Sequence, residues 1–382
     1  MRILAADDQP LVLTAIMQSL KDTDFELHFA KDGKEAMEKF EALHPDLVIV
    51  DLNMPGKSGF DVLSHIKNSN EGNTHVMVMS GEDDEAIKVK AFNAGADEYI
   101  QKPVGLNELR IRTQKILKQP INVLSSGDSE SKKDSQVIQK NIVGVVIPCY
   151  NEETRLKAET FKKFVNANLG YHLCFVNDGS TDNTLQVLEE LAEGREDYIS
   201  VYNCPHNGGK AEAVRQGILH MIKDPQLNYI GYLDADLSTN FQDFDDLVQT
   251  ISNSEFQIVG GSRIARMGAD ITKAGSRAII SKTINLMIRN ILGMSFQDTQ
   301  CGAKVMTREV AQKMFIEKFK TSWLFDVEIF LRMKNYYGAG KVQKLICERP
   351  LKRWVHEDGS KLSMKDSIKI IWQLMQITFS KK

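Results

Sequence analysis

The chain has 382 residues, of which 42% are hydrophobic and 26% are charged, and its formal net charge is −3. These values are typical of a folded protein of two or three domains, and they exclude a wholly disordered, collagen-like or disulfide-scaffold chain. The near-neutral total gives no reason to expect nucleic-acid binding. The charge is uneven, however. Residues 1–119 carry 14 basic and 20 acidic side chains, whereas the chain from Lys341 onward carries ten basic and four acidic ones.

The cysteines and the N-terminus bear on the compartment. The five cysteines are dispersed without a C-x-x-C pair, which suits a reducing compartment and argues against a structural zinc site. The N-terminus meets Asp7 and Asp8 before any signal-like apolar region is complete. No run approaches the 18 apolar residues of a membrane-spanning helix. We therefore expect a cytoplasmic protein.

Residues 1–118 alternate short apolar runs with amphipathic stretches. Repeated strand–helix units of this kind predict an α/β fold with a parallel sheet covered by helices on both faces. The expected strands are Arg2–Ala6, Phe25–Ala30, Leu47–Asp51, His75–Met79 and Glu98–Ile100.

The segment 119–140 is rich in serine and charge, and its Ser-Ser-Gly sequence disfavours a helix, so we expect a flexible linker there. A second α/β domain is expected over residues 141–362. Its apolar strands Val143–Ile147, Leu173–Asn177 and Tyr229–Leu233 all end in polar loops. After about residue 265 the pattern becomes helical and basic.

Polar residues gather where the strands of the first domain end. Asp7 and Asp8 close the first strand, Asp51 closes the third, and Lys102 follows the fifth. Because the carboxyl ends of parallel strands form one crevice, we expect these groups to meet there. Clustered carboxylates repel one another unless a divalent cation or an ammonium compensates, and oxygen ligands without His or Cys favour Mg²⁺.

Residues 1–118 resemble the response-regulator receiver domains. The resemblance rests on the acid pair, the run Asp51-Leu-Asn-Met-Pro-Gly-Lys-Ser-Gly, Ser80, Tyr99 and a Lys-Pro pair, all in order. It implies a (βα)5 flavodoxin-like fold in which Asp51 accepts a phosphoryl group by nucleophilic attack. The partner would be a cognate histidine kinase or a phosphotransfer protein.

The same resemblance assigns the other residues of this pocket. Asp8, Asp51 and the Asn53 carbonyl would bind Mg²⁺, and Asp7 would assist through water. Ser80 and Lys102 would hold phosphoryl oxygens, while Tyr99 would be the switch aromatic.

Four loops of the second domain carry residues suited to a nucleotide. Asp178 lies in an Asp-Gly-Ser turn, suited to a ribose diol or a base N–H, and Gly208-Gly209 allows close approach of the backbone to a ligand beside the phosphate-binding candidate Lys210. Asp234 and Asp236 flank a strand-end turn that suits Mg²⁺ or Mn²⁺ on a diphosphate. A P-loop is excluded because its spacing is absent.

In this order the loops resemble the family 2 glycosyltransferases, inverting enzymes of the GT-A fold that use nucleotide-sugar donors. The resemblance covers about residues 141–365 and places the metal on Asp236, with Asp234 supporting it. The residues that it assigns to the nucleotide-sugar are Pro148, Tyr150, Glu152, Asp178, Lys210, Asp234 and Asp236.

Later segments resemble the polyprenyl-phosphate glycosyltransferases, with the dolichyl-phosphate β-glucosyltransferases nearest and the mannosyltransferases next. These segments include Asp298-Thr-Gln-Cys-Gly and Trp354-Val-His-Glu-Asp-Gly-Ser-Lys361. The implied acceptor is a lipid monophosphate, which is largely dianionic at neutral pH and needs no general base. The implied donor is UDP-glucose or GDP-mannose.

Arginine binds phosphate through a planar fork, so basic residues near these segments are candidates for the acceptor phosphate. They are Arg263, Arg277, Arg353 and Lys361. Asp298, Gln300 and Glu328 are expected to shape the sugar and acceptor pocket, or alternatively to form a structural network.

Residues 363–382 predict a basic amphipathic helix, too short to span a bilayer and suited to its surface. Packing on the protein core or a dimer contact is the alternative. We expect a peripheral protein at the inner face of the cytoplasmic membrane.

The whole pattern predicts a phosphorylation-regulated hexosyltransferase of cell-envelope or exopolysaccharide glycosylation. Phosphorylation would act by forming a homodimer or by releasing an inhibitory contact. The alternatives are a transferase acting directly on polysaccharide or protein, which needs a carboxylate base, and a nucleotide-sugar sensor without turnover.

Overall fold

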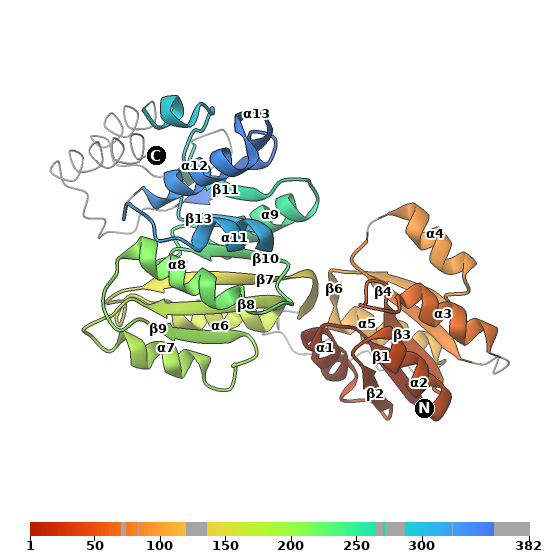
Figure 1. Cartoon of the computed structure of the whole chain (residues 1–382). Helices are drawn as coiled ribbons and strands as arrows, with labels where there is room; N and C mark the ends of the chain where they lie inside the picture. The colour runs from red at the N-terminus through yellow and green to blue at the C-terminus, as the bar shows by residue number, and fades with distance from the viewer. Residues whose placement is uncertain are drawn as a thin grey trace. The chain divides into compact units, whose positions relative to one another are not determined.

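The computed structural model describes residues 1–69, 74–82, 84–119, 136–264, 270–271, 287–322 and 324–354. The chain divides into two compact units (Figure 1). Unit 1 comprises Met1–Asn141 and Lys163–Gly170, and unit 2 comprises Ile142–Lys162 and Tyr171–Lys382.

In the described part of unit 1, five parallel strands form a sheet in the order β2-β1-β3-β4-β5. Every residue of β3 is buried, as expected for a strand covered by helices on both faces. The predicted parallel α/β sheet is confirmed, and the predicted strands differ from the observed ones by at most one residue at either end. The strands are β1 (Arg2–Ala6), β2 (Glu26–Ala30), β3 (Leu47–Asp51), β4 (His75–Ser80) and β5 (Glu98–Gln101).

The helices of unit 1 begin shortly after the strands, and several carry side-chain caps. Asp32 accepts from Glu35 N at 2.9 Å, and Ser58 and Asp61 form a capping box at the helix that follows β3. This connectivity places the ends of β1, β3, β4 and β5 along one edge of the sheet. The helices are α1 (Pro10–Leu20), α2 (Gly33–Leu43), α3 (Gly59–Asn68), α4 (Glu85–Asn93) and α5 (Leu106–Ile116).

Unit 1 also includes the first residues of β7 (Val137–Cys149). The short strand β6 (Val104–Gly105) pairs antiparallel with Val137 and Ile138, and Ile138 is buried. The structure thus differs from the expected linker 119–140 at residues 137–140. Local composition did not reveal that β6 supplies these residues with backbone partners. Residues 120–135 lie outside the described residues.

The sheet in the described part of unit 2 has the order β14-β11-β13-β10-β7-β8-β9. β10 pairs in parallel with β7, whereas β13 lies antiparallel between β10 and β11. Strands β13 and β14 correct the expectation that the chain is helical after about residue 265. The remaining strands are β8 (Asn168–Asn177), β9 (Ile199–Asn203), β10 (Tyr229–Leu233), β11 (Ile258–Ser262), β13 (Ala303–Thr307), β14 (Ile346–Pro350), and the paired short strands β12 (Asp270–Ile271) and β15 (Arg353–Trp354).

The two faces of this sheet carry different helices. Val146, Ile230 and Tyr232 pack in one apolar core with residues of α8, α11 and α12. Gly231 faces α9 on the other side, where a Cβ would press on Phe244. The helices are α6 (Ala158–Ala167), α7 (Thr184–Ala192), α8 (Lys210–Met221), α9 (Phe241–Ser252), α11 (Arg308–Phe315), α12 (Phe325–Tyr337) and α13 (Ala339–Val342).

None of the helices in the described part of the chain is long and apolar enough to cross a membrane. The amphipathic helix predicted for residues 363–382 lies outside the described residues.

Candidate functional site

The polar residues predicted to meet at the edge of the unit 1 sheet do so. The Lys102 ammonium lies 2.8 Å from Asp7 Oδ2 and 2.9 Å from Asp51 Oδ1, and all three residues are buried. Asp8 is partly exposed beside them. The predicted phosphoacceptor Asp51 is thus held at the end of β3 by a charge-assisted hydrogen bond.

Burial and neighbouring charge shape the protonation of this pocket. Burial raises the pKa of Asp7 to about 6, although Lys102 opposes the shift. Burial also raises the pKa of Asp8, and the Asp51 carboxylate adds to that rise. Desolvation disfavours the Lys102 ammonium, but Asp7 and Asp51 outweigh it and raise the pKa of Lys102. The site therefore resists accumulating negative charge, which favours binding of a cation.

Glu82 connects the remaining predicted residues of this pocket, and sequence reasoning missed it. Its carboxylate accepts from Asn53 Nδ2 at 3.2 Å, its backbone N donates to Ser80 Oγ at 3.1 Å, and its carbonyl accepts from Tyr99 OH at 3.1 Å. Asn53 N in turn donates to Asp51 Oδ2 at 2.6 Å. The only sequence signal was the position of Glu82, two residues after Ser80.

In unit 2, the loops after β7 and β8 are tied together by side chains. Asn151 Oδ1 accepts from Thr181 N at 2.9 Å, and Glu153 Oε1 accepts from Asn183 Nδ2 at 2.8 Å. Glu152 N donates to Thr184 Oγ1 at 2.8 Å. These bonds fix the loop that contains the predicted donor residues Tyr150, which is exposed, and Glu152, while Pro148 lies in the last residues of β7.

Asp178 lies where predicted, after β8, but its carboxylate binds backbone. Oδ1 accepts from Gly208 N at 2.8 Å and Oδ2 accepts from Gly209 N at 2.9 Å. Burial raises the pKa of Asp178, and the two amides oppose that shift. Gly209 has a φ of 79°, which a side-chain-bearing residue rarely adopts, and α8 starts at the next residue. Asp178 thus holds the Gly-Gly turn that presents Lys210.

Lys210 and Asp234 form an ion pair, with Lys210 Nζ 2.5 Å from Asp234 Oδ1. Desolvation disfavours the charged lysine, but Asp234, followed by Asp326, outweighs it and raises the pKa of Lys210. Two of the predicted donor-site residues, from different loops, are therefore in direct contact. Both are partly exposed and so accessible to a ligand.

Glu152, in the loop after β7, interacts electrostatically with Asp236, which is in the same loop as Asp234. Asp236 Oδ1 accepts from Ser238 N at 2.8 Å, and the Lys157 ammonium donates to Asp236 O at 3.3 Å. Burial raises the pKa of Glu152; Arg155 opposes this, and the Asp236 carboxylate adds to the rise. The next residue, Leu237, has a φ of 55°, which is strained for a branched side chain and typical of functional turns.

Gly302 packs directly against Asp234 in this turn. Asp234 N donates to Gly302 O at 3.1 Å, and a Cβ on Gly302 would collide with the Asp234 carboxylate. The sequence marked this glycine as part of Asp298-Thr-Gln-Cys-Gly, but the close approach becomes visible when β10 and β13 are paired.

A buried network that the sequence did not predict lies next to this pair. Lys304 Nζ is 2.7 Å from Asp326 Oδ1 and donates to Cys301 O at 2.8 Å, while Tyr232 OH also donates to Asp326. A lysine within the apolar strand β13 was the available signal. Because Asp326 contributes to the raised pKa of Lys210, this network belongs electrostatically to the same site.

Arg263 is paired rather than open. Asp298 Oδ2 lies 2.6 Å from Arg263 Nε, and Asp298 Oδ1 lies 2.8 Å from Arg263 Nη2. The two residues therefore form a bidentate ion pair. Desolvation raises the pKa of Asp298, but the hydrogen bonds from Arg263 outweigh this and lower it. The guanidinium lies over the Trp354 ring, 5.4 Å from its centroid.

The other predicted acceptor residues differ in exposure and in their partners. Arg353 is exposed in β15, and Gln300 is partly buried. Glu328 is engaged in a structural network, since its oxygens bind Lys320 N at 2.9 Å and Arg332 Nη2 at 2.8 Å. Arg277 and Lys361 lie outside the described residues.

The donor sets of both sites fit the predicted cations, because carboxylate and carbonyl oxygens are the ligands of Mg²⁺ and Mn²⁺. In the described part of the chain, no three His, Cys, Asp or Glu side chains are grouped so that they could hold a metal ion. The carboxylates of Asp51 and Asp234 instead contact Lys102 and Lys210.

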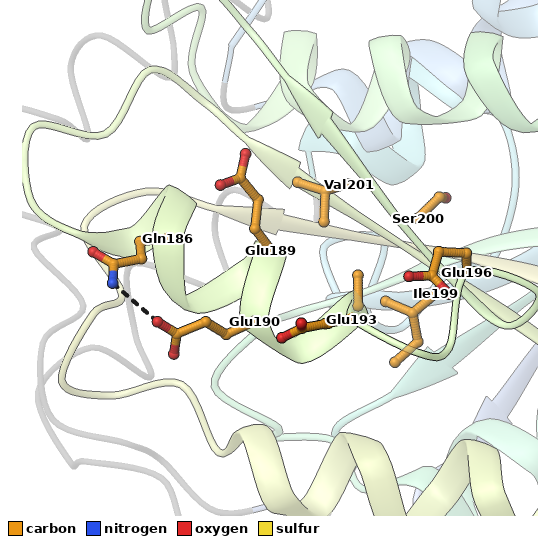
Figure 2. Close-up of a pocket in the computed structure, with 9 residues that line it drawn as sticks. Gln186, Glu189, Glu190, Glu193, Glu196, Ile199, Ser200 and Val201 are labelled. Atoms are coloured by element: carbon orange, nitrogen blue, oxygen red, sulfur yellow. Dashed lines mark hydrogen bonds between the residues drawn. The ribbon is translucent and has the colours of Figure 1, made fainter.

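A separate groove lies between α7 and the start of β9 (Figure 2). Its lining is acidic and includes Glu189, Glu190, Glu193 and Glu196, with Gln186 Nε2 donating to Glu190 at 2.9 Å. The groove is at the amino end of β9, whereas Asp178 and Asp234 follow the carboxyl ends of β8 and β10. It is therefore not part of the candidate site.

Comparison with known proteins identifies the families of both domains. The response regulator receiver domain family matches residues 3–114, and glycosyl transferase family 2 matches residues 144–315. The dolichyl-phosphate beta-glucosyltransferase of Dictyostelium discoideum is 31% identical over 252 residues, which cover 62% of this chain and 74% of that protein. The chain belongs to glycosyl transferase family 2.

Further relatives carry the same description. The dolichyl-phosphate beta-glucosyltransferases of Saccharomyces cerevisiae and Drosophila melanogaster are both 30% identical, and the matches cover 65% and 58% of this chain and 76% and 69% of those proteins. This family 2 glycosyltransferase therefore carries a response-regulator receiver domain fused to its N-terminal side, as the sequence predicted.

Proposed function

We propose that this glycosyltransferase moves a hexose from a nucleotide-sugar to a polyprenyl phosphate, with inversion at the anomeric carbon, under control of phosphorylation at Asp51. The observation that carries the proposal is the convergence of Lys210, Asp234 and Asp236 at the end of β10. The similarity to dolichyl-phosphate glucosyltransferases supports the lipid acceptor. UDP-glucose and GDP-mannose are the proposed donors.

On the donor side, a divalent cation on Asp236, supported by Asp234, would neutralise the leaving diphosphate. Lys210 contributes its ammonium to the same diphosphate and leaves Asp234 to do so. Asp178 keeps the Gly208-Gly209 turn in place, so that the start of α8 faces the ligand.

On the acceptor side, the lipid phosphate attacks as a dianion, so no residue needs to remove a proton. Arg263 and Arg353, with Arg277 and Lys361, would hold the phosphate and shield its charge from the diphosphate. The ion pair with Asp298 restricts Arg263 to one orientation.

On the receiver side, Asp51 accepts the phosphoryl group from a histidine kinase or a phosphotransfer protein. Asp8, Asp51 and Asn53 would hold Mg²⁺, with Asp7 assisting, and Lys102 and Ser80 would bind the phosphoryl oxygens.

Contacts within unit 1 support a regulatory role for this reaction. β6 follows Lys102 almost directly and pairs with Val137 and Ile138, and a Cβ on Gly81, next to Ser80, would press on the Lys140 side chain. A movement of Ser80 or Lys102 on phosphorylation thus reaches the start of β7. The same strand ends at Cys149, immediately before the donor loop.

The transfer reaction tests the proposal. The full chain is incubated with labelled UDP-glucose or GDP-mannose, polyprenyl phosphate and Mg²⁺ or Mn²⁺, and the lipid is extracted. We expect label in the lipid, and a rate that changes when acetyl phosphate is added to the wild type but not to Asp51→Asn. An absence of lipid label with every donor and metal would refute the transfer, and an unchanged rate would refute the regulation. Label in added polysaccharide or protein would favour a direct transferase.

The basic character of the chain after Lys341 supports a peripheral location at the inner membrane surface. Flotation with anionic vesicles tests this, and a protein that stays at the bottom of the gradient would contradict it.

A further inference from the structure

A partly buried glutamate of β14, Glu348, holds the loop that carries Asp298. Glu348 Oε2 accepts from Gln297 N and Oε1 accepts from Asp298 N, both at 2.7 Å. Burial raises the pKa of Glu348, and the hydrogen bonds from the Asp298 and Gln297 amides oppose this rise. The carboxylate therefore fixes two consecutive peptide groups of the loop.

The loop held by Glu348 in turn orients Arg263. From the fixed backbone, Asp298 Oδ2 accepts from Arg263 N at 2.9 Å as well as from its guanidinium. The guanidinium is then confined between Asp298 and the Trp354 ring. A change in the position of the 297–298 backbone would move this arginine.

A second acid, Asp243, is buried and does the same for the segment of Arg353. Asp243 lies in the first turn of α9, is 2% exposed, and accepts from Lys352 N at 2.8 Å and from Arg353 N at 3.0 Å. Asp243 N is itself bonded to the helix cap Asn240 at 2.7 Å, so the acid is anchored at its own end.

Both acids thus use each of their oxygens on adjacent backbone amides. A carboxylate that gives up water for amides alone is costly, and backbone carbonyls could satisfy the same amides with less desolvation. We call each of these carboxylates, with the two amides that it binds, a clamp. Both clamps lie at segments that carry or contact an arginine proposed to bind the acceptor phosphate. Neither clamp lies in the loops of the donor residues Lys210 and Asp178.

We propose that Glu348 and Asp243 are positioning residues for the acceptor phosphate, holding Arg263 and Arg353 respectively in the orientation that binds it. This inference rests on the proposed lipid-phosphate acceptor. The two acids would act through the arginines and would not themselves touch the substrate.

The isosteric variants Glu348→Gln and Asp243→Asn test the proposal in the full chain. An amide side chain has one acceptor oxygen, so it loses one of the two backbone bonds and turns an N–H toward the other amide. We expect the KM for a short-chain polyprenyl phosphate to rise about tenfold in each variant. The KM for the nucleotide-sugar should change less than twofold.

Glu309→Gln serves as the matched control, because Glu309 is exposed on α11 and pairs with Lys313 away from these clamps. It should leave both KM values unchanged. Far-ultraviolet circular dichroism and the melting temperature report whether each variant is folded, and the two clamps are on different elements, so one folded variant suffices for the comparison.

The outcomes separate the two levels of the proposal. Equal rises in both KM values, or none in a folded variant, would overturn the positioning role while leaving the transfer reaction intact. A wild-type chain that transfers no sugar to polyprenyl phosphate would overturn the proposed function and the inference with it. If Asp243→Asn and Glu348→Gln both fail to fold, the acids are structural and the inference is wrong.

Discussion

The receiver pocket and the transferase site both gather carboxylates at the end of a sheet, but they use them differently. In the receiver, Asp7 and Asp51 face the Lys102 ammonium directly. In the transferase, Asp178, Asp243 and Glu348 face backbone amides, whereas Asp234 pairs with Lys210. The first site is built by contacts between functional groups, and the second largely by acids that hold loops.

This difference has a consequence for mutation. If Asp51 is phosphorylated as proposed, removing a group from the receiver pocket should remove part of the chemistry, because Lys102 contacts Asp51 directly. Removing a loop-holding acid should instead move a segment, and we expect it to change the affinity for one of the proposed substrates more than the chemical step. The predictions below test this contrast, beginning with the largest effect.

Asp51→Asn should abolish phosphorylation of the chain by acetyl phosphate and Mg²⁺, since the amide cannot attack phosphorus. The incorporation of labelled phosphate measures this. Asp22→Asn, an exposed acid after α1, is the control and should label like the wild type. Residual labelling of Asp51→Asn at the wild-type level would show that another residue is the acceptor.

Gly302→Ala should reduce sugar transfer by about a hundredfold or more, because the new methyl group collides with the Asp234 carboxylate and displaces it. Gly340→Ala is a matched control, since a Cβ there meets nothing within 4 Å. Transfer rates and circular dichroism of both variants are compared. A folded Gly302→Ala chain with normal activity would argue against a role for the Asp234 position.

Asp298→Asn should lower the free energy of unfolding by about 2–3 kcal/mol at neutral pH, as it leaves the partly exposed Arg263 without its counter-charge. Because Arg263 lowers the pKa of Asp298 below its usual 3.8, the contribution of the ion pair is complete above that pH. It is lost as the pH falls through the lowered value.

Urea unfolding at several pH values measures this contribution. The gap between the wild type and Asp298→Asn should be constant above about pH 4 and narrow in more acidic buffer. A gap that widens on acidification would contradict the sign.

Asp178→Asn should raise the KM for the nucleotide-sugar about fivefold and leave the KM for the lipid phosphate within twofold, because the amide can hold one of the two glycine N–H groups. Initial rates with each substrate varied in turn measure the two constants. If kcat falls more than the affinity for the donor, Asp178 acts on a reacting group directly and does not only hold a loop.

Much of the fold was predictable because it depends on local patterns. Strands such as β1, β3 and β10 carry short apolar runs, and acids of both sites follow or end these strands. β13 was missed because Lys304 interrupts its apolar run, and its compensation by Asp326 depends on a residue 22 positions away. The Glu348 and Asp243 clamps also depend on distant backbone, since Asp243 binds amides 109 and 110 residues further along.

The site residues divide along the same line. Asp7, Asp51, Ser80 and Lys102 end strands of one parallel sheet, so topology alone brought them together. The partner of Arg263 is Asp298, which is 35 residues further along the chain. A local sequence pattern around Arg263 therefore cannot predict this contact. For Glu328 the sequence left open a pocket role and a structural network, and its bonds to Arg332 and Lys320 N favour the network.

The pairing of β6 with the start of β7 has a consequence for how such fusions can be recombined. Ile138 is 1% exposed and belongs to unit 1, although it lies within the segment that looks like a spacer between two modules. An exchange of residues 1–118 for another receiver would separate β6 from Val137 and Ile138. The backbone of these two residues would lose its partner, and Ile138 would be exposed to water. A functional chimera should therefore keep residues 136–141 together with the receiver that supplies β6. The structural unit of this receiver thus extends beyond residue 114, where the match to the receiver family ends.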